Sequence, residues 1–190
     1  MEIQTSQLQV PGPLAPGASL DASSAPMTHP VAPRAAVVES GVLDIGSGRL
    51  TICDPRSDRP AAALDRAVPN GRYQVLVSRV SRLVASTLVR FRPASPAQWE
   101  RAESSLSGYN RITGLMDHRT YELNRDRKDV YDALLVGEMP WKQVTLGTGQ
   151  DALFVTSAFG DGSSVSYWGL DDDDRVCCLF TDFRMFPFVA

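Results

Sequence analysis

The alternation of side chains in the stretch RYQVLVSRV, residues 72–80, constrains the fold of this chain more than any other feature. Tyr73, Val75 and Val77 share one face of an extended strand, and the residues between them share the other. A second run of this kind, residues 84–91, follows after a short turn and is predicted to pair with the first. A strand buried on one face only is typical of antiparallel sheets.

Further strand patterns occur on both sides of this pair. Residues 42–45 and 49–53 flank the triplet Gly-Ser-Gly, which predicts a hairpin. Four more strands are expected near the C-terminus, at residues 143–146, 152–157, 163–170 and 175–183. Four consecutive aspartates, residues 171–174, join the last two. We interpret them as an exposed hairpin tip, since they lack the spaced ligands and central glycine of a calcium loop, which is the alternative.

Two helices are expected to cover the sheet. In SPAQWERAESS, residues 95–105, Ser95 and Gln98 have the spacing of a capping box and would turn Trp99 and Ala102 towards the core. A second helix is expected from Asp117 to about residue 136, capped by Asp117 itself. The predicted fold class is therefore α+β, with mostly antiparallel sheet, about two covering helices and a disordered N-terminal tail.

Residues 1–36 differ in composition from the rest of the chain. They hold six prolines, three charged residues and no aromatic residue, so they bury too little apolar surface to fold. We expect a disordered leader here and one domain over residues 37–190. The leader also resembles the N-terminal export segment of bacterial type III secreted effectors, which implies secretion into a host cell; the alternative is a plain disordered leader on a cytoplasmic protein.

Composition argues against several classes of function. The net charge is −3, and no stretch approaches the roughly 18 apolar residues of a membrane span, so neither nucleic acid nor membrane is expected as a partner. The three cysteines lack CxxC spacing, which argues against a zinc site or a disulfide framework. Outside the leader the one histidine is His118, which could serve as base for Cys53 or Cys178 or lie exposed in the first turn of a helix.

Arginine is concentrated in one part of the chain. Six arginines lie between Arg72 and Arg101, against one acidic residue, Glu100. Because they occupy alternating strand positions, we interpret them as the solvated face of a half-buried sheet. Recognition of an acidic partner or of nucleic acid is the alternative.

The C-terminal stretch GDGSSVSYWGLDDDDRVCCLFTDF, residues 160–183, resembles the signature of a bacterial family known as the domain of unknown function numbered 4241, whose hallmark is the GDG motif. The stretches SGRLTICDP, PNGRYQVLVS and RITGLMD are also similar to the family pattern, so the resemblance spans about residues 38–186. It implies a shared fold and a candidate site but no reaction. Some relatives resemble parts of toxin and immunity systems, which implies a protein partner.

The candidate site consists of aspartates at strand ends and helix starts with the glycines of the motif: Asp54, Asp117, Asp161, Asp182, Gly160 and Gly162. If the carboxylates converge, they would bind a hard cation such as Mg²⁺ or Ca²⁺ and support hydrolysis. The competing interpretation is structural, with Asp117 as a helix cap and Asp161 in a tight turn. No cofactor is predicted under that interpretation.

Two functions follow as hypotheses. The first is a non-enzymatic protein-interaction module, acting as a secreted effector or in a toxin and immunity system. The alternative is a divalent-metal hydrolase that uses Asp54, Asp161 and Asp182.

Overall fold

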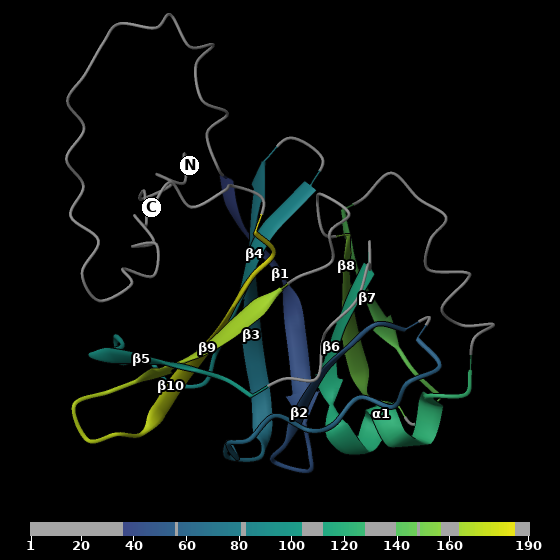
Figure 1. Ribbon diagram of the computed structural model, residues 1–190, viewed down its shortest axis with the longest axis horizontal. Helices are drawn as coiled ribbons and strands as arrows, with labels where there is room; N and C mark the ends of the chain where they lie inside the picture. The colour runs from purple at the N-terminus through teal and green to yellow at the C-terminus, as the bar shows by residue number, and fades with distance from the viewer. Residues whose placement is uncertain are drawn as a thin grey trace, which may run out of the picture.

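The computed structural model describes residues 36–55, 57–80, 83–103, 112–127, 140–147, 149–156 and 164–184 (Figure 1). The first strand begins at Ala36, one residue before the expected start of the domain. Residues 1–35 of the predicted leader and the GDG triplet at 160–162 lie outside the described residues.

Ten strands and one helix occur in these ranges. The strands are β1 (Ala36–Ile45), β2 (Leu50–Cys53), β3 (Gly71–Val80), β4 (Leu83–Arg90), β5 (Gln98–Arg101), β6 (Ile112–Asp117), β7 (Trp141–Thr145), β8 (Asp151–Thr156), β9 (Val165–Leu170) and β10 (Val176–Asp182). The helix is α1 (His118–Asn124). The described protein is thus a mainly antiparallel β structure, and the prediction of an α+β fold with two covering helices is wrong.

The strands form two sheets. The six-stranded sheet has the order β1-β3-β4-β10-β9-β5, and the four-stranded sheet has the order β2-β6-β8-β7. Within the six-stranded sheet, β3 and β4 pair antiparallel from Gln74 opposite Arg90 to Val80 opposite Leu83, which confirms the predicted pairing. The hairpin of β9 and β10 is confirmed as well.

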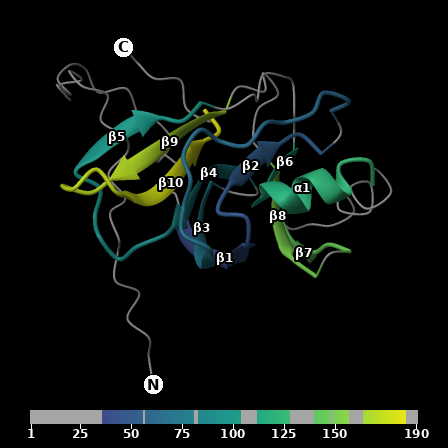
Figure 2. The same ribbon diagram turned by 90° about the horizontal axis from the view of Figure 1, so that it is seen from below.

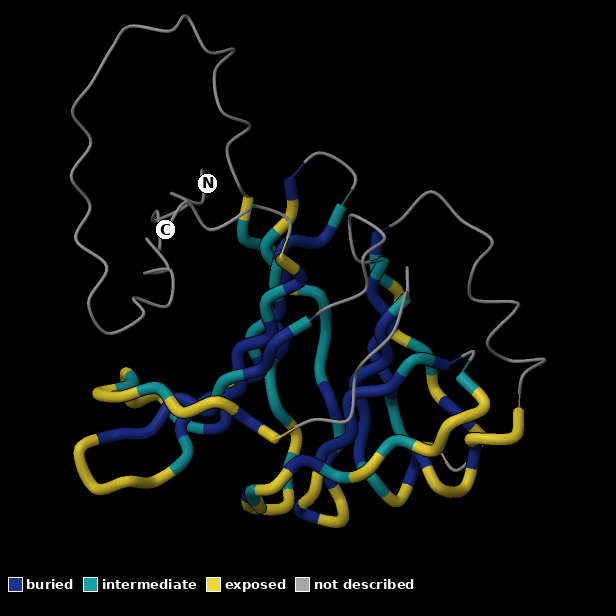
Figure 3. The backbone as a smooth tube through the Cα atoms, viewed as in Figure 1, coloured by how far each residue is buried: buried dark blue, intermediate teal, exposed yellow. Residues whose placement is uncertain are grey.

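The two sheets enclose the main hydrophobic core. Val75, Val89 and Leu179 are buried on the inner face of the six-stranded sheet, and Leu115 and Leu153 meet them from the four-stranded sheet. The segment between β2 and β3 closes one end, where backbone bonds join Leu64 to Leu50 and Val68 to Gly48. Figure 3 shows the buried residues running along the inner strands of both sheets.

Helix α1 covers the outer face of the four-stranded sheet (Figure 2). A second, smaller core lies beneath it, in which Tyr121 of the helix packs with Cys53, Met116 and Phe154 of the strands. Because this sheet has a core on both faces, almost every residue of β2, β6 and β8 is buried. No helix in the described ranges is long and apolar enough to cross a membrane.

The helix expected at residues 95–105 is not formed where the structure describes it. Residues Gln98–Arg101 are strand β5, paired with β9 from Gln98 opposite Leu170 onwards. The side chain of Gln98 donates to Asp174 instead of closing a capping box. A cap contributes about 1 kcal/mol, whereas the strand gains a full ladder of hydrogen bonds and buries Ala102 in the core.

The second expected helix begins where it was predicted, but residues 125–127 no longer belong to it. Asp117 caps α1, and Tyr121 is buried as expected. The helix ends at Asn124, because the following backbone turns so that Arg127 N–H donates to the Asn124 carbonyl at 2.9 Å. The rest of the predicted helix lies at residues 128–136, outside the described residues.

The prediction of a hairpin around residues 46–48 is also wrong, although both strands exist. β1 pairs with β3 and β2 pairs with β6, so the chain leaves one sheet and enters the other at this point. Gly48 has φ of 73°, which suits glycine, and the side chains of Leu43, Ile45 and Leu50 all turn into the core between the sheets. Burial of three large side chains outweighs the local turn preference.

Candidate functional site

The structure places three of the candidate aspartates, Asp54, Asp117 and Asp182, and does not bring them together. Leu50 lies opposite Asp117 in the β2–β6 ladder and Cys53 lies opposite Gly114, so Asp54 and Asp117 are at opposite ends of β2. Four residues of strand separate them, about 13 Å. Asp182 belongs to the other sheet. In the described ranges, no group of three or more His, Cys, Asp or Glu residues is placed to hold a metal ion.

Asp117 has a structural role. Its carboxylate is fully buried and accepts hydrogen bonds from the backbone N–H groups of Arg119 and Thr120, at 3.1 and 3.3 Å. It also accepts from the N–H and hydroxyl of Ser47, at 2.8 and 2.6 Å. One side chain thereby caps the helix and fixes the segment that crosses between the sheets.

Asp161 and both motif glycines lie outside the described residues, so the structure does not test whether the GDG motif is a turn or a site. Asp182 can be placed. It shares the outer face of β10 with Cys178 and Phe180, as predicted, and pairs with Val165, the residue that begins β9 shortly after the motif in sequence.

The environment of Asp182 disfavours its charge. Burial raises the pKa of this carboxyl, and the backbone N–H of Arg184, which donates to it at 2.8 Å, together with the Arg184 charge, only partly offsets the effect. A folded-state pKa above the unfolded value means that the ionised side chain opposes folding at neutral pH.

We expect Asp182→Asn to raise the thermal midpoint at pH 7 by up to about 2 °C, since the amide oxygen can still accept from Arg184. The difference should vanish as the pH falls below the unfolded-state pKa of an ordinary aspartate, where both states bind the proton. Thermal melts of both proteins between pH 3 and roughly pH 8 check this. A variant that is less stable at pH 7 would show that the carboxylate binds a cation or cationic group.

The cysteines and His118 do not form a nucleophilic site. Cys53, Cys177 and Cys178 are all buried and free. Burial raises the pKa of Cys53, and likewise of Cys178, to about 12, so the reactive thiolate is scarce at neutral pH. The Nδ1 atom of His118 instead lies 2.7 Å from the hydroxyl of Thr51.

A shallow cavity of about 370 Å³ lies beside α1. Its lining combines Arg59 and Arg125 with Asp58 and Asp126 over the ring of Tyr121. Arg125 also pairs with Glu122 at 3.5 Å, and the Tyr121 hydroxyl accepts from the backbone of Ala61 at 2.8 Å. Charges of both signs and occupied polar groups give this cavity no preference for one class of ligand.

A different feature emerges on the outer face of the six-stranded sheet. The strand registers align four apolar side chains in one row across β3, β4, β10 and β9: Leu76, Leu88, Phe180 and Tyr167. The next partner in this row is Arg101 of β5. Trp99 of β5 lies beside the row, 6.0 Å from Phe180 between ring centroids and at 69° to it. We call these six residues, together with Arg90, the outer face.

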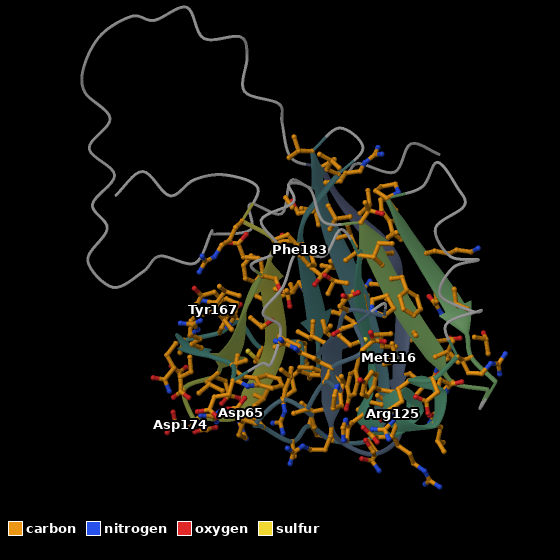
Figure 4. All side chains as sticks on the ribbon, turned by 45° about the vertical axis from the view of Figure 1, so that its right-hand side comes forward. Asp65, Met116, Arg125, Tyr167, Asp174 and Phe183 are labelled. Carbon is orange, nitrogen blue, oxygen red and sulfur yellow. The ribbon has the colours of Figure 1, made fainter. Side chains whose placement is uncertain are left out.

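No described element covers the outer face. The sandwich core lies behind it, and the one described helix packs on the other sheet. Figure 4 shows Tyr167 on the side of the molecule away from Met116, which lies in the four-stranded sheet. Leu76, Leu88, Trp99 and Tyr167 are half-buried, whereas Phe180 at the centre of the row is buried. The four half-buried side chains are the part of the row that can bury further area against a partner.

The outer face also carries positive charge. Ion pairs within the described ranges engage Arg66, Arg72, Arg125 and Arg175 with neighbouring carboxylates. Arg90 and Arg101 are exposed, and the described residues provide no ion pair for either. The outer face therefore combines an apolar row with two exposed guanidinium groups that form no ion pair within the described ranges.

Sequence reasoning found parts of this surface without recognising it. Four of the six arginines, Arg72, Arg79, Arg90 and Arg101, are exposed on strands, whereas Arg92 follows β4 and Arg82 lies outside the described residues. The prediction that Trp99 lies on the buried face of a helix is wrong. The period-2 sequence Trp99-Glu100-Arg101 is compatible with a strand, and that reading would have put Trp99 and Arg101 on one side.

No family model, curated protein or solved structure matches this chain. The resemblance to the GDG-motif family therefore stays an interpretation of the sequence.

Proposed function

We propose that this chain is a non-enzymatic protein-interaction module that binds its partner through the outer face of the six-stranded sheet. The observation that carries this proposal is the apolar row from Leu76 to Tyr167, which no described element covers. The row ends at Arg101, which has no ion pair among the described residues. Aromatic and arginine side chains are enriched where protein partners bind most tightly.

The polar groups elsewhere support the same choice. The buried carboxylate of Asp117 already accepts hydrogen bonds from the first turn of α1 and from Ser47. Asp54 lies beyond the far end of β2 from Asp117. The buried thiols have raised pKa values, which makes them poor nucleophiles. A secreted effector and an immunity protein would each use a binding surface of this kind.

The proposal is tested by site-specific cross-linking. A benzoylphenylalanine in place of Tyr167 should capture a protein from a lysate of the source organism or of a host cell, whereas the same group in place of Leu123, an exposed residue on α1, should not. The captured protein is then produced separately, and its affinity is measured by calorimetry.

We expect Leu88→Glu to weaken that affinity at least about tenfold, because it places a charge in the apolar row. Leu123→Glu should leave the affinity unchanged and serves as the matched control. Capture through position 123 alone, equal affinities of the two variants, or the absence of any captured protein would each contradict the proposal.

A further inference from the structure

The six-stranded sheet ends in β5, and no strand of the described ranges pairs with the far edge of β5. Its near edge is paired with β9, from Gln98 opposite Leu170 to Arg101 opposite Tyr167. Figure 1 shows β5 projecting at the end of the sheet, away from the four-stranded sheet. An unpaired edge of this kind presents backbone N–H and C=O groups to which an extended segment can add as a further strand.

The side chains of β5 differ in what they already contact. Gln98 donates to Asp174, and Glu100 pairs with Arg66, so the chain itself occupies the inner-facing side. Trp99 and Arg101 project from the outer face. Trp99 contacts Phe180, and Arg101 is exposed without an ion pair among the described residues.

The geometry points to an extended acidic segment of a partner protein as the occupant of this edge, added as a strand beside β5. The inference rests on the proposed function and specifies how the partner binds. Alternate residues of an added strand lie on the outer face, so a carboxylate comes opposite Arg101 and an apolar side chain, two residues away, comes beside Trp99.

The charge requirement follows from the cross-strand position. Opposite charges placed directly across a strand pair stabilise it, and like charges destabilise it, so a basic segment is disfavoured opposite Arg101. The pair would lie at an exposed edge, where salt screens it, and the affinity should fall as ionic strength rises.

The test uses a displayed library of random twelve-residue peptides, selected on the full-length protein. We expect the selected peptides to contain an acidic and an apolar residue two positions apart, and to slow amide hydrogen exchange in β5. Arg101→Glu should weaken their binding at least tenfold and should, in a fresh selection, recover basic peptides. Arg119→Glu, at an exposed arginine on α1, is the matched control and should change neither result.

The outcomes separate this inference from the proposed function. Selected peptides without acidic residues, or peptides that protect the apolar row but not β5, overturn the inference and leave the interaction module intact. Self-association of the protein that is lost in Arg101→Glu also overturns it, since the occupant is then a second copy. A library that yields no binder, together with no cross-linked protein at position 167, overturns both.

Discussion

Replacing Asp117 by alanine is expected to lower the free energy of unfolding by about 3 kcal/mol. The carboxylate is fully buried and accepts four hydrogen bonds, at distances between 2.6 and 3.3 Å. Two of the donors begin the helix, and the other two belong to Ser47 in the segment that crosses between the sheets. Alanine leaves the buried N–H of Thr120 without an acceptor and releases both elements at once.

Urea unfolding followed by circular dichroism measures this loss. Asp117→Asn keeps an acceptor at the cap, but its NH2 group cannot accept from Ser47, so it should cost about 2 kcal/mol, less than alanine. Asp151→Ala is the control, since Asp151 is half-buried and accepts two side-chain hydrogen bonds, at 2.7 Å from Gln143 and Thr145, that are exposed to solvent. It should cost under about 1 kcal/mol. Equal stabilities of the Asp117 and Asp151 alanine variants would contradict a structural role for Asp117.

The sequence predicted best where local pattern and long-range packing agree. The alternation of Tyr73, Val75 and Val77 indicated both the strand and its buried face, because a core on one side imposes that period. Asp117 and Tyr121 indicated the start of α1, because the cap and the first buried turn are local features. The hairpin of β9 and β10 was predicted from its turn of aspartates.

The turn between β9 and β10 shows why its own residues were sufficient to predict the hairpin. Asp171 accepts from the backbone N–H groups of Asp173 and Arg175 and from the Arg175 guanidinium. Partial burial acts to raise the pKa of Asp171, but these hydrogen bonds and the Arg175 charge outweigh it and hold the pKa below its usual value. The turn residues alone supply these contacts.

Predictions failed where a distant strand decides the conformation. Residues 98–101 have a local helix signal, but β9 lies alongside them with Gly169, whose absent side chain makes room for Trp99 and Pro96. A Cβ at position 169 would lie 3.2 Å from the Trp99 ring and 2.9 Å from Pro96. Nothing within residues 95–105 reveals that distant glycine. The same holds for β1 and β2, whose partners lie elsewhere in the chain.

Whether the candidate aspartates converge could not be predicted from the sequence for a related reason. Carboxylates at strand ends converge only if those strands end at the same edge, and sequence order does not give strand order. A metal site shared by Asp54 and Asp117 requires them to meet, yet the antiparallel β2–β6 pair holds them apart. The outer face depends on the register of five strands, which no single stretch of sequence contains.

The second large loss of stability is expected on replacement of Trp168, which lies on the inner face of β9. Its ring is fully buried, it packs against Phe91 at 6.3 Å between centroids, and its indole N–H donates to Asp65 at 2.8 Å. Trp168→Ala should lower the free energy of unfolding by about 4 kcal/mol. Trp168→Phe, which keeps most of the volume and loses the hydrogen bond, should lose about 2 kcal/mol and remain measurable if the alanine variant does not fold.

Trp99 provides the matched comparison. It lies on the outer face, where it pairs with Gly169, and the next residue, Glu100, pairs with Trp168 in the same ladder. Because Trp99 is only half-buried, Trp99→Ala should cost about 1 kcal/mol of stability and act mainly on partner binding. Urea unfolding of both alanine variants gives the contrast. If Trp99→Ala destabilised the protein as much as Trp168→Ala, the outer face would be part of the folded core, and no partner could reach it without unfolding the sheet edge.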